Sequence, residues 1–226
     1  MKVSEIFYSL QGEGFLAGTP SVFVRLAGCP LRCRWCDTKY AQPPQSGNEY
    51  SVEQILEETK KWSCRHAVVT GGEPMINPDL ADLAQRLQET KKHITIETAG
   101  VSFVPGLVCD LMSISPKLSN SIPESADLAA IHKKAMLNFP VLRELIKDYN
   151  YQMKFVVDSA DDLAEIRATI EEIGNVDTEK VLLMAQAATR DKFMVKFPMV
   201  AEMCKQAGFA FSPRLQVLLW NNQRGT

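Results

Sequence analysis

Residues 21–36 read SVFVRLAGCPLRCRWC, an apolar run typical of a buried strand that leads directly into a loop with three cysteines. Cys29, Cys33 and Cys36 form a Cys-x-x-x-Cys-x-x-Cys triplet with no fourth cysteine close by. Thiolates bind zinc, copper(I) and iron–sulfur clusters, and structural zinc sites or closed clusters ordinarily take four protein ligands. Three ligands therefore predict a metal cluster with one open coordination position, at which a small molecule can bind.

Two other interpretations of the cysteines remain open. A structural zinc site would need a fourth ligand from elsewhere in the chain, and Cys64 and His66 are the candidates. A disulfide framework is less favoured, because we expect a cytoplasmic protein in which thiols stay reduced. Cys109 and Cys204 lie among apolar residues and are predicted to pack in the interior.

Composition limits the class of protein. The 226 residues are 46% hydrophobic and 23% charged, which fits a single domain with a substantial core over residues 1–226. A net charge of −2 gives no broad attraction to phosphate backbones or anionic lipids, so we expect a small-molecule substrate, with no nucleic acid and no membrane as partner. The first residues lack the apolar run of a signal peptide, and no stretch reaches the roughly 20 apolar residues of a membrane span, which favours a cytoplasmic protein.

Short apolar runs alternate with segments of helical period, a pattern typical of β/α units around a parallel sheet. The predicted strands cover residues 21–26, 67–70, 94–97, 107–114, 152–157 and 181–185. The predicted helices cover residues 51–62, 77–89, 139–149, 159–173 and 192–206, and loops are expected at 40–50 and 116–130. Six β/α steps are too few for a closed eight-stranded barrel, so the predicted fold class is α/β with a partial, open (β/α)6-type barrel.

Polar and glycine-rich residues follow the predicted strands, at the edge where parallel β/α arrays bind ligands. The second strand is followed by Gly71-Gly72-Glu73-Pro74, the third ends at Glu97, and Ser115-Pro116-Lys117 follow the fourth. Glycine allows close approach to the backbone, and Glu73 can accept hydrogen bonds from an ammonium group. A Gly-Gly pair alone is also typical of a simple turn. Next to the cysteine loop, it indicates a site for an amino-acid-like ligand.

The cysteine loop and the Gly-Gly-Glu-Pro segment together resemble the radical S-adenosylmethionine (SAM) superfamily. The resemblance implies a 4Fe–4S cluster ligated by Cys29, Cys33 and Cys36, with SAM chelated at the open iron. It also implies that residues 71–73 hold the methionine portion of SAM.

A narrower resemblance covers nearly the whole chain. Residues 5–14 (EIFYSLQGEG), 23–29 (FVRLAGC), 36–38 (CDT) and 115–117 (SPK) are similar to the 7-carboxy-7-deazaguanine synthases. That family implies a radical SAM lyase that converts 6-carboxy-5,6,7,8-tetrahydropterin to 7-carboxy-7-deazaguanine with loss of ammonia, in queuosine biosynthesis. The enzymatic alternative is a radical SAM activase of a glycyl-radical enzyme, which shares the two general motifs. A zinc-bound or cluster-bound scaffold without catalysis is the alternative from another class.

The resemblance also implies a role for each matching residue. The substrate would be bound by Leu10, Gln11, Gly12, Glu13, Arg25 and Thr70. SAM would be bound by Gly71, Gly72, Glu73, Glu97, Ser115, Pro116, Lys117 and Gln186, with Glu97 also a candidate for proton transfer. Thr38 would be a ligand of Mg²⁺. The resemblance further implies a reducing electron donor such as flavodoxin or ferredoxin as partner, and a homodimer.

Arg25 is expected to pair with the pterin carboxylate, because its fork donates two parallel hydrogen bonds. The competing interpretation is an arginine that points outward from an edge strand.

Three features depart from the family pattern. Gln186 has no proline before it, Arg214-Leu215-Gln216 stands where a histidine is common, and the tail 221–226 has no assigned role. His66, His93 and His132 carry no motif and are predicted to be ordinary packed or surface residues.

Overall fold

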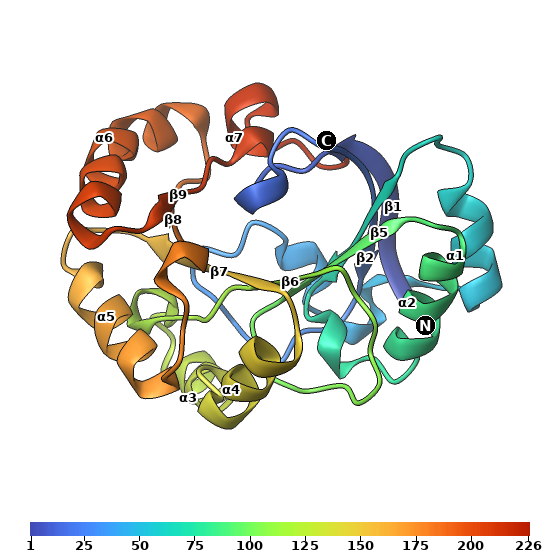
Figure 1. Ribbon diagram of the computed structural model, residues 1–226, viewed down its shortest axis with the longest axis horizontal. Coiled ribbons are helices and arrows are strands. Elements are labelled where there is room, and N and C mark those ends of the chain that lie inside the picture. The colour runs from blue at the N-terminus through green and yellow to red at the C-terminus, as the bar shows by residue number, and fades with distance from the viewer.

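The computed structural model describes residues 1–226, and its nine strands form one continuous sheet in the order β3-β1-β2-β4-β5-β6-β7-β8-β9. The strands are β1 (Lys2–Leu10), β2 (Pro20–Leu26), β3 (Asn48–Glu49), β4 (His66–Gly71), β5 (His93–Thr98), β6 (Leu111–Ile114), β7 (Tyr151–Val157), β8 (Val181–Ala185) and β9 (Ala210–Phe211). The helices are α1 (Val52–Thr59), α2 (Leu80–Glu89), α3 (Ala126–Ala135), α4 (Phe139–Asp148), α5 (Asp162–Ile173), α6 (Arg190–Ala207) and α7 (Leu215–Trp220). The helices lie around the outer side of the curved sheet (Figure 1).

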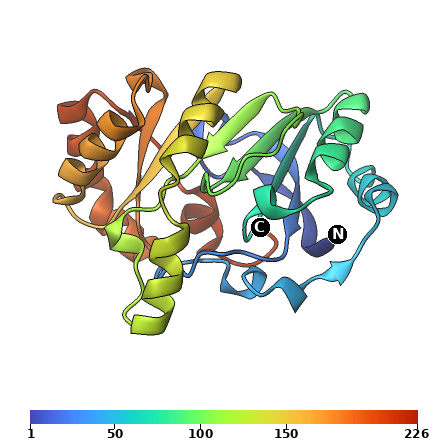
Figure 2. The same ribbon diagram turned by 90° about the horizontal axis from the view of Figure 1, so that it is seen from below.

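Strand β2 and strands β4 to β9 pair in parallel, whereas β1 pairs antiparallel with both β2 and β3. The two end strands, β3 and β9, do not pair with each other, so the barrel stays open. Figure 2 shows the same curved sheet from below. The predicted α/β class with a partial barrel of parallel strands is confirmed.

Local sequence explains where several elements begin and end. Strands β7 and β8 are buried along their whole length, as expected for parallel strands covered on both faces. The predicted capping box of α1 is confirmed, because Ser51 and Gln54 exchange both side-chain to backbone hydrogen bonds. Helix α6 ends at Ala207 and is capped by Gly208, whose φ of 72° is favourable only for glycine and a few small polar residues.

The sequence prediction was wrong in several details. The strand predicted from residue 107 begins at Leu111, α1 ends at Thr59 rather than at Trp62, and the loop predicted at 116–130 contains the start of α3. Strand β1 was not predicted as a strand, because its residues are mostly half-buried and show no clear alternation. The short elements β3, β9 and α7 were also missed.

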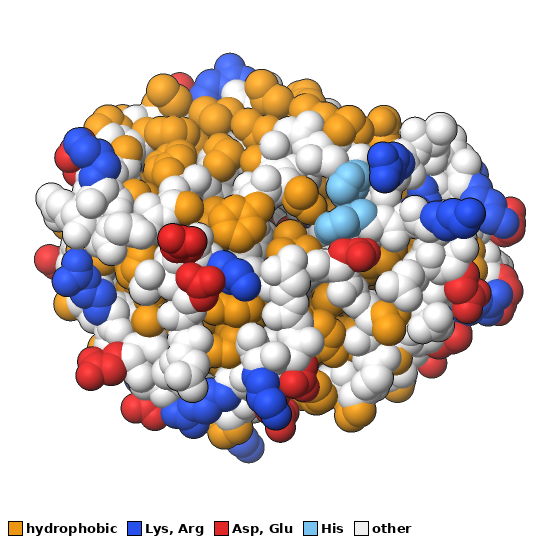
Figure 3. Space-filling model, in the orientation of Figure 1, with side chains coloured by type: hydrophobic (Ala, Val, Ile, Leu, Met, Phe, Trp, Pro, Cys, Tyr) orange, Lys and Arg blue, Asp and Glu red, His pale blue; other side chains and the backbone are white.

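The surface shows no single dominant charge. In Figure 3, charged side chains of both signs are spread over the face, whereas hydrophobic side chains gather along its upper part, over α6 and α7. Met194, Val195 and Leu219 are exposed on these two helices. None of the helices is both long and apolar enough to span a bilayer.

Candidate active site

One cavity of about 260 Å³ opens at the carboxyl ends of the parallel strands. Its wall contains nearly all of the residues predicted for the site, namely Leu10, Gln11, Gly12, Glu13, Arg25, Cys29, Cys33, Cys36, Thr38, Thr70, Gly71, Gly72, Glu97, Ser115, Lys117 and Gln186. Segments that are far apart in the sequence therefore meet around one space. Glu73 and Pro116 are the two predicted residues that do not line it.

The three cysteines of the loop after β2 are free thiols on the cavity wall. No group of three or more His, Cys, Asp or Glu side chains converges closely enough to hold a single metal ion. Cys64 lies off this wall and donates to the carbonyl of His66, so the geometry does not favour a zinc site completed by these residues. A cluster of several irons takes each thiolate at a different iron, so three separated thiols on one wall fit an iron–sulfur cluster.

Burial affects the charge of these thiols. It raises the pKa of Cys29 to about 12 and that of Cys33 to about 11, so both are protonated at neutral pH in the metal-free protein. A bound metal displaces the thiol proton outright. Cluster binding is therefore expected to release protons.

Gly71 and Gly72 bring the end of β4 against the start of the cysteine loop. The amide of Gly72 donates to the carbonyl of Leu26 at 2.9 Å, and the amide of Glu73 donates to the carbonyl of Gly28 at 2.8 Å. A Cβ atom on Gly72 would lie 2.3 Å from the Gly28 oxygen, so a side chain would push the two segments apart. The glycine pair thus has a structural reason in addition to its position on the cavity wall.

Glu73 is buried beneath the cavity, where its carboxylate joins the ends of β4 and β5. Its Oε1 accepts hydrogen bonds from the Met75 amide at 3.0 Å and the Thr98 hydroxyl at 2.7 Å, and its Oε2 accepts one from the Ala99 amide at 2.8 Å. Burial raises the pKa of Glu73, and these donors oppose the shift only in part. These contacts tie the carboxylate to the loops after β4 and β5, and the predicted contact of Glu73 with an ammonium group stays a prediction.

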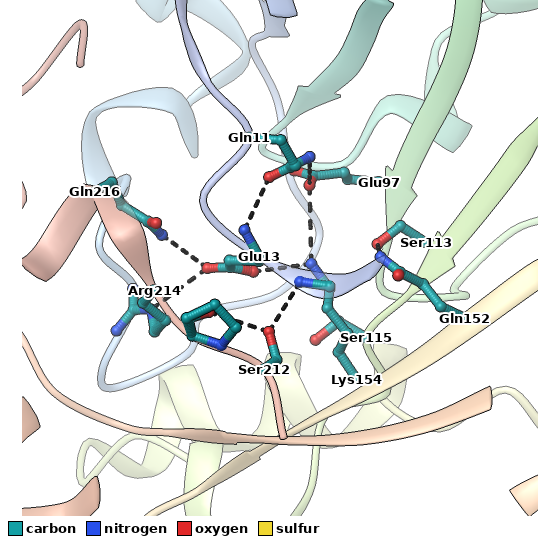
Figure 4. A network of polar contacts seen from close by, with 12 residues as sticks. Gln11, Glu13, Glu97, Ser113, Ser115, Gln152, Lys154, Ser212, Arg214 and Gln216 are labelled. Carbon is teal, nitrogen blue, oxygen red and sulfur yellow. Dashed lines mark hydrogen bonds and ion pairs between the residues drawn. The ribbon is translucent and has the colours of Figure 1, made fainter. Parts of the chain in front are cut away.

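Glu13 is the centre of a polar network on the cavity wall (Figure 4). Its Oε2 accepts from Lys154 Nζ at 2.8 Å, and its Oε1 accepts from Gln216 Nε2 at 2.8 Å and Arg214 Nε at 3.3 Å. Burial alone would raise the pKa of Glu13, but the positive charges of Lys154 and Arg214 outweigh it and lower the value to about 2. Glu13 is therefore an ionised hydrogen-bond acceptor at neutral pH.

Lys154 connects this network to the carboxylate at the end of β5. It projects from β7 with 4% of its side chain exposed, and its Nζ lies 3.8 Å from Glu97 Oε1. Gln11 donates to the same Glu97 oxygen at 3.1 Å. Burial alone would lower the pKa of Lys154, but Glu13 and Glu97 raise it overall, so the ammonium stays charged. The sequence analysis missed Lys154, although a single lysine inside the apolar run 151–157 was a usable signal.

Arg25 reaches the cavity from β2, which lies between β1 and β4 and is not an edge strand. Its Nε donates to Glu5 Oε1 at 2.7 Å, and its guanidinium lies over the ring of Phe7 at 5.5 Å from the centroid. The two Nη groups make no hydrogen bond within the chain. Arg25 is thus oriented by protein contacts while two of its nitrogens remain available to a ligand.

The tail after α7 returns to β1 and completes the wall (Figure 1). Residues 222–226 line the cavity, and Arg224 donates to Glu5 Oε2 at 3.0 Å while its guanidinium stacks on the ring of Tyr40 at 4.3 Å. Tyr40 donates to the other oxygen of Glu5 at 2.6 Å. The sequence left the role of the tail open, and the structure places it at the predicted substrate arginine.

Two further wall residues were recognised in the sequence only as departures from the family pattern. Arg214 donates to Asp37 Oδ2 at 2.6 Å and so connects Glu13 to the residue beside Thr38. Gln216 holds Glu13 through Nε2, whereas its Oε1 is buried and has no hydrogen-bond partner. This oxygen lies against Gly12, where an added Cβ atom would be only 1.9 Å away from it.

The comparisons with known proteins agree with this geometry. The family model of the Radical SAM superfamily matches residues 23–118, which contain the cysteine loop and the Gly-Gly-Glu segment. The 7-carboxy-7-deazaguanine synthase of Rhodopirellula baltica is 40% identical over 99% of this chain and 88% of its own length, and that of Halobacterium salinarum is 37% identical over 98% and 91%. The crystal structure of QueE from Escherichia coli matches with a TM-score of 0.64 at 26% identity, covering 93% of this chain and 92% of its own. The chain belongs to the 7-carboxy-7-deazaguanine synthase family of the radical SAM superfamily.

Proposed function

We propose that this protein is a radical SAM lyase that converts 6-carboxy-5,6,7,8-tetrahydropterin to 7-carboxy-7-deazaguanine with loss of ammonia, in queuosine biosynthesis. The observation that carries the proposal is a single cavity with the three free thiols on one part of its wall and Arg25 and the Glu13 network on another. The full-length likeness to synthases favours this function over an activase of glycyl-radical enzymes.

In this proposal the cofactor site is built from the loops after β2, β4 and β6, together with Glu97 on β5 and Gln186 after β8. Cys29, Cys33 and Cys36 would hold a 4Fe–4S cluster. SAM would be held by Gly71, Gly72, Glu73, Glu97, Ser115, Pro116, Lys117 and Gln186, all of which except Glu73 and Pro116 line the cavity. When bound, cluster and SAM would supply the one-electron chemistry that removes a hydrogen atom from a carbon of the substrate. Lys117 donates to both the carbonyl and the hydroxyl of Ser115, which fixes this segment in place.

Substrate recognition is assigned to residues that bracket the pterin. Arg25 receives the carboxylate through its free Nη groups, because a guanidinium fork matches carboxylate geometry. The ionised Glu13 on the cavity wall accepts a hydrogen bond from a ring N–H group. Phe7 and Phe23, which stack at 4.9 Å, provide an apolar surface that excludes water.

The proposal has further parts that rest on the family resemblance. Thr38 is assigned to Mg²⁺, supported by its position on the cavity wall while its neighbour Asp37 is paired with Arg214. We also propose a flavodoxin or ferredoxin as electron donor, a homodimer, and a single radical SAM domain over residues 1–226 in the cytoplasm. Titration of activity with Mg²⁺ after chelation tests the magnesium site. Light scattering tests the homodimer.

The decisive experiment is anaerobic incubation of the reconstituted protein with SAM, dithionite, Mg²⁺ and 6-carboxytetrahydropterin. Mass spectrometry should detect 7-carboxy-7-deazaguanine, and omission of SAM should abolish it. Cleavage of SAM without this product would refute the assignment of 6-carboxytetrahydropterin as the substrate, while the assignment of radical SAM chemistry would stand. Stoichiometric zinc with no SAM cleavage would refute the enzyme altogether.

A further inference from the structure

Two buried polar residues outside the predicted site, His132 and Ser121, accept hydrogen bonds from the backbone of the cysteine loop. The backbone amide of Arg32 donates to His132 Nδ1 at 3.0 Å, and the amide of Arg34 donates to the Ser121 carbonyl at 2.9 Å. Arg32 and Arg34 flank Cys33 on either side. His132 and Ser121 are both 0% exposed, although His132 lies on α3, about one hundred residues after the loop.

The hydrogen bonds of His132 allow only one arrangement of its protons. Nδ1 accepts from the Arg32 amide, so it carries no hydrogen, and a neutral ring then has its proton on Nε2. Ser121 Oγ lies 2.9 Å from Nε2 and donates its own hydrogen to the Leu118 carbonyl at 2.5 Å, which leaves the oxygen free to accept. A directed chain of hydrogen bonds therefore runs from the Arg32 amide through His132 and Ser121 to Leu118.

The same segment is anchored to the barrel on its other side. Trp35 Nε1 donates to the Asn120 carbonyl at 3.1 Å, and the Asn120 side chain donates to the Val156 carbonyl and to Asp162 Oδ2, both at 2.9 Å. Residues 118–121 thus bridge from the cysteine loop to the end of β7 and the start of α5. The loop backbone is fixed against the sheet through this bridge.

We propose that His132, through the hydrogen bond that its Nδ1 accepts from the Arg32 amide, is a positioning residue that sets the backbone conformation of the cysteine loop so that the three thiols face the cavity. The inference rests on the proposed function, because that function assigns the thiols to the cluster. The sequence analysis expected His132 to be an ordinary packed residue, and its burial is confirmed. His132 also accepts a hydrogen bond from Arg32, which lies between Cys29 and Cys33, and this contact is more than apolar packing.

Two near-isosteric variants separate the two hydrogen bonds of the imidazole. In His132→Asn, Oδ1 can take the place of Nδ1 and accept from the Arg32 amide, while the bond to Ser121 is lost. In His132→Gln, the terminal amide can replace Nε2 and reach Ser121, while the Arg32 amide loses its acceptor. His93→Asn is the matched control, because His93 begins β5 and does not line the cavity.

The first measurement is amide hydrogen exchange of Arg32 in the metal-free chain, which does not depend on any activity. Exchange should be slow in wild type, His93→Asn and His132→Asn, and about tenfold faster in His132→Gln, the change expected for loss of one buried hydrogen bond. Equal exchange in the Asn and Gln variants would overturn the proposal. Loss of the whole fold in both, seen by circular dichroism, would assign His132 to general stability and would also overturn it.

The second measurement follows the cluster after anaerobic reconstitution. His132→Gln should lose iron to a chelator about tenfold faster than His132→Asn and should give an altered electron paramagnetic resonance spectrum in the reduced state. Identical spectra and iron loss in both variants would refute the positioning role. If wild type takes up no iron, the proposed function fails, while the exchange measurement still decides whether His132 holds the loop.

Discussion

Lys154 Nζ lies 2.8 Å from Glu13 Oε2, so that a buried cation on β7 is paired with the carboxylate that follows β1. We expect Lys154→Met to lower the free energy of unfolding by about 3 kcal/mol, because removal of one partner leaves a buried charge with fewer compensating groups. Chemical denaturation at neutral pH measures the change. Lys205→Met, which removes an exposed ion pair with Glu202, is the control and should change stability by less than about 1 kcal/mol. If the two substitutions changed the free energy of unfolding equally, the Lys154–Glu13 pair would contribute no more to stability than an exposed ion pair.

Glu13 should make the stability of the protein depend on pH in the acid range. Burial by itself would raise its pKa, but Lys154 and Arg214 lower it from 4.5 to about 2. A carboxyl group with a lower pKa in the folded state contributes stability above the unfolded value, and that contribution is lost as the pH falls from about 4.5 toward about 2. We expect Glu13→Gln to flatten this part of the stability profile in denaturation experiments at a series of pH values. Parallel profiles for wild type and variant would contradict the assignment.

Arg25 should contribute strongly to substrate affinity. We expect Arg25→Ala to weaken binding of 6-carboxytetrahydropterin by about 2–5 kcal/mol, because one partner of a buried charge pair is lost. Arg25→Lys should recover only part of this affinity, since an ammonium group cannot donate two parallel hydrogen bonds. Anaerobic calorimetry measures the affinities, with Arg167→Ala on the exposed face of α5 as control. Unchanged affinity in Arg25→Ala would place the carboxylate elsewhere.

Cys33→Ala should abolish SAM cleavage and reduce bound iron, because the thiolate is one of only three protein ligands in the proposed cluster site. Iron and sulfide analysis after reconstitution, together with chromatography of the SAM cleavage products, measures both effects. Cys109→Ala is the control, because Cys109 packs against the core and does not line the cavity. Wild-type cleavage in Cys33→Ala would remove this residue from the ligand set.

Arg224→Ala tests the tail. The Arg224 side chain is more than half exposed, so we expect the free energy of unfolding to change by less than about 1 kcal/mol. The KM for the pterin should nevertheless rise several-fold, because Arg224 holds the tail on Glu5 and Tyr40 at the cavity wall. Steady-state kinetics measures the effect, and an unchanged KM would show that the tail does not shape the substrate site.

The sequence predicted the parts of this molecule that depend on local pattern. The buried strands, the capping box at Ser51 and the cysteine loop are each encoded within a few consecutive residues. Strand β6 was placed four residues too early because the apolar residues 107–109 continue its pattern although the strand itself begins at Leu111. Helix α3 was missed because a loop with a proline precedes it and conceals its start.

The network around Glu13 could not be predicted in the same way, because its members meet only after folding. Lys154 is 141 residues from Glu13 and Arg214 is 201 residues away. Glu73 is a similar case, since its position after two glycines gives no sign that its carboxylate accepts hydrogen bonds from Thr98 and Ala99. A single sequence carries no information about which distant donor will face a given carboxylate.

Strand β1 enters the sheet antiparallel, ahead of the parallel array, and carries residues 10–13 to the cavity from outside the segment 23–118. Lys154, Arg214 and Gln216, the partners of Glu13, also lie outside that segment. Most of the Glu13 network is thus encoded outside the segment that carries the cysteine loop, whereas Arg25 and Thr70 lie inside it. Chimeras that exchange the first strand together with the last three β/α units would replace the surroundings of one carboxylate while the thiols and the wall arginine stay those of this chain.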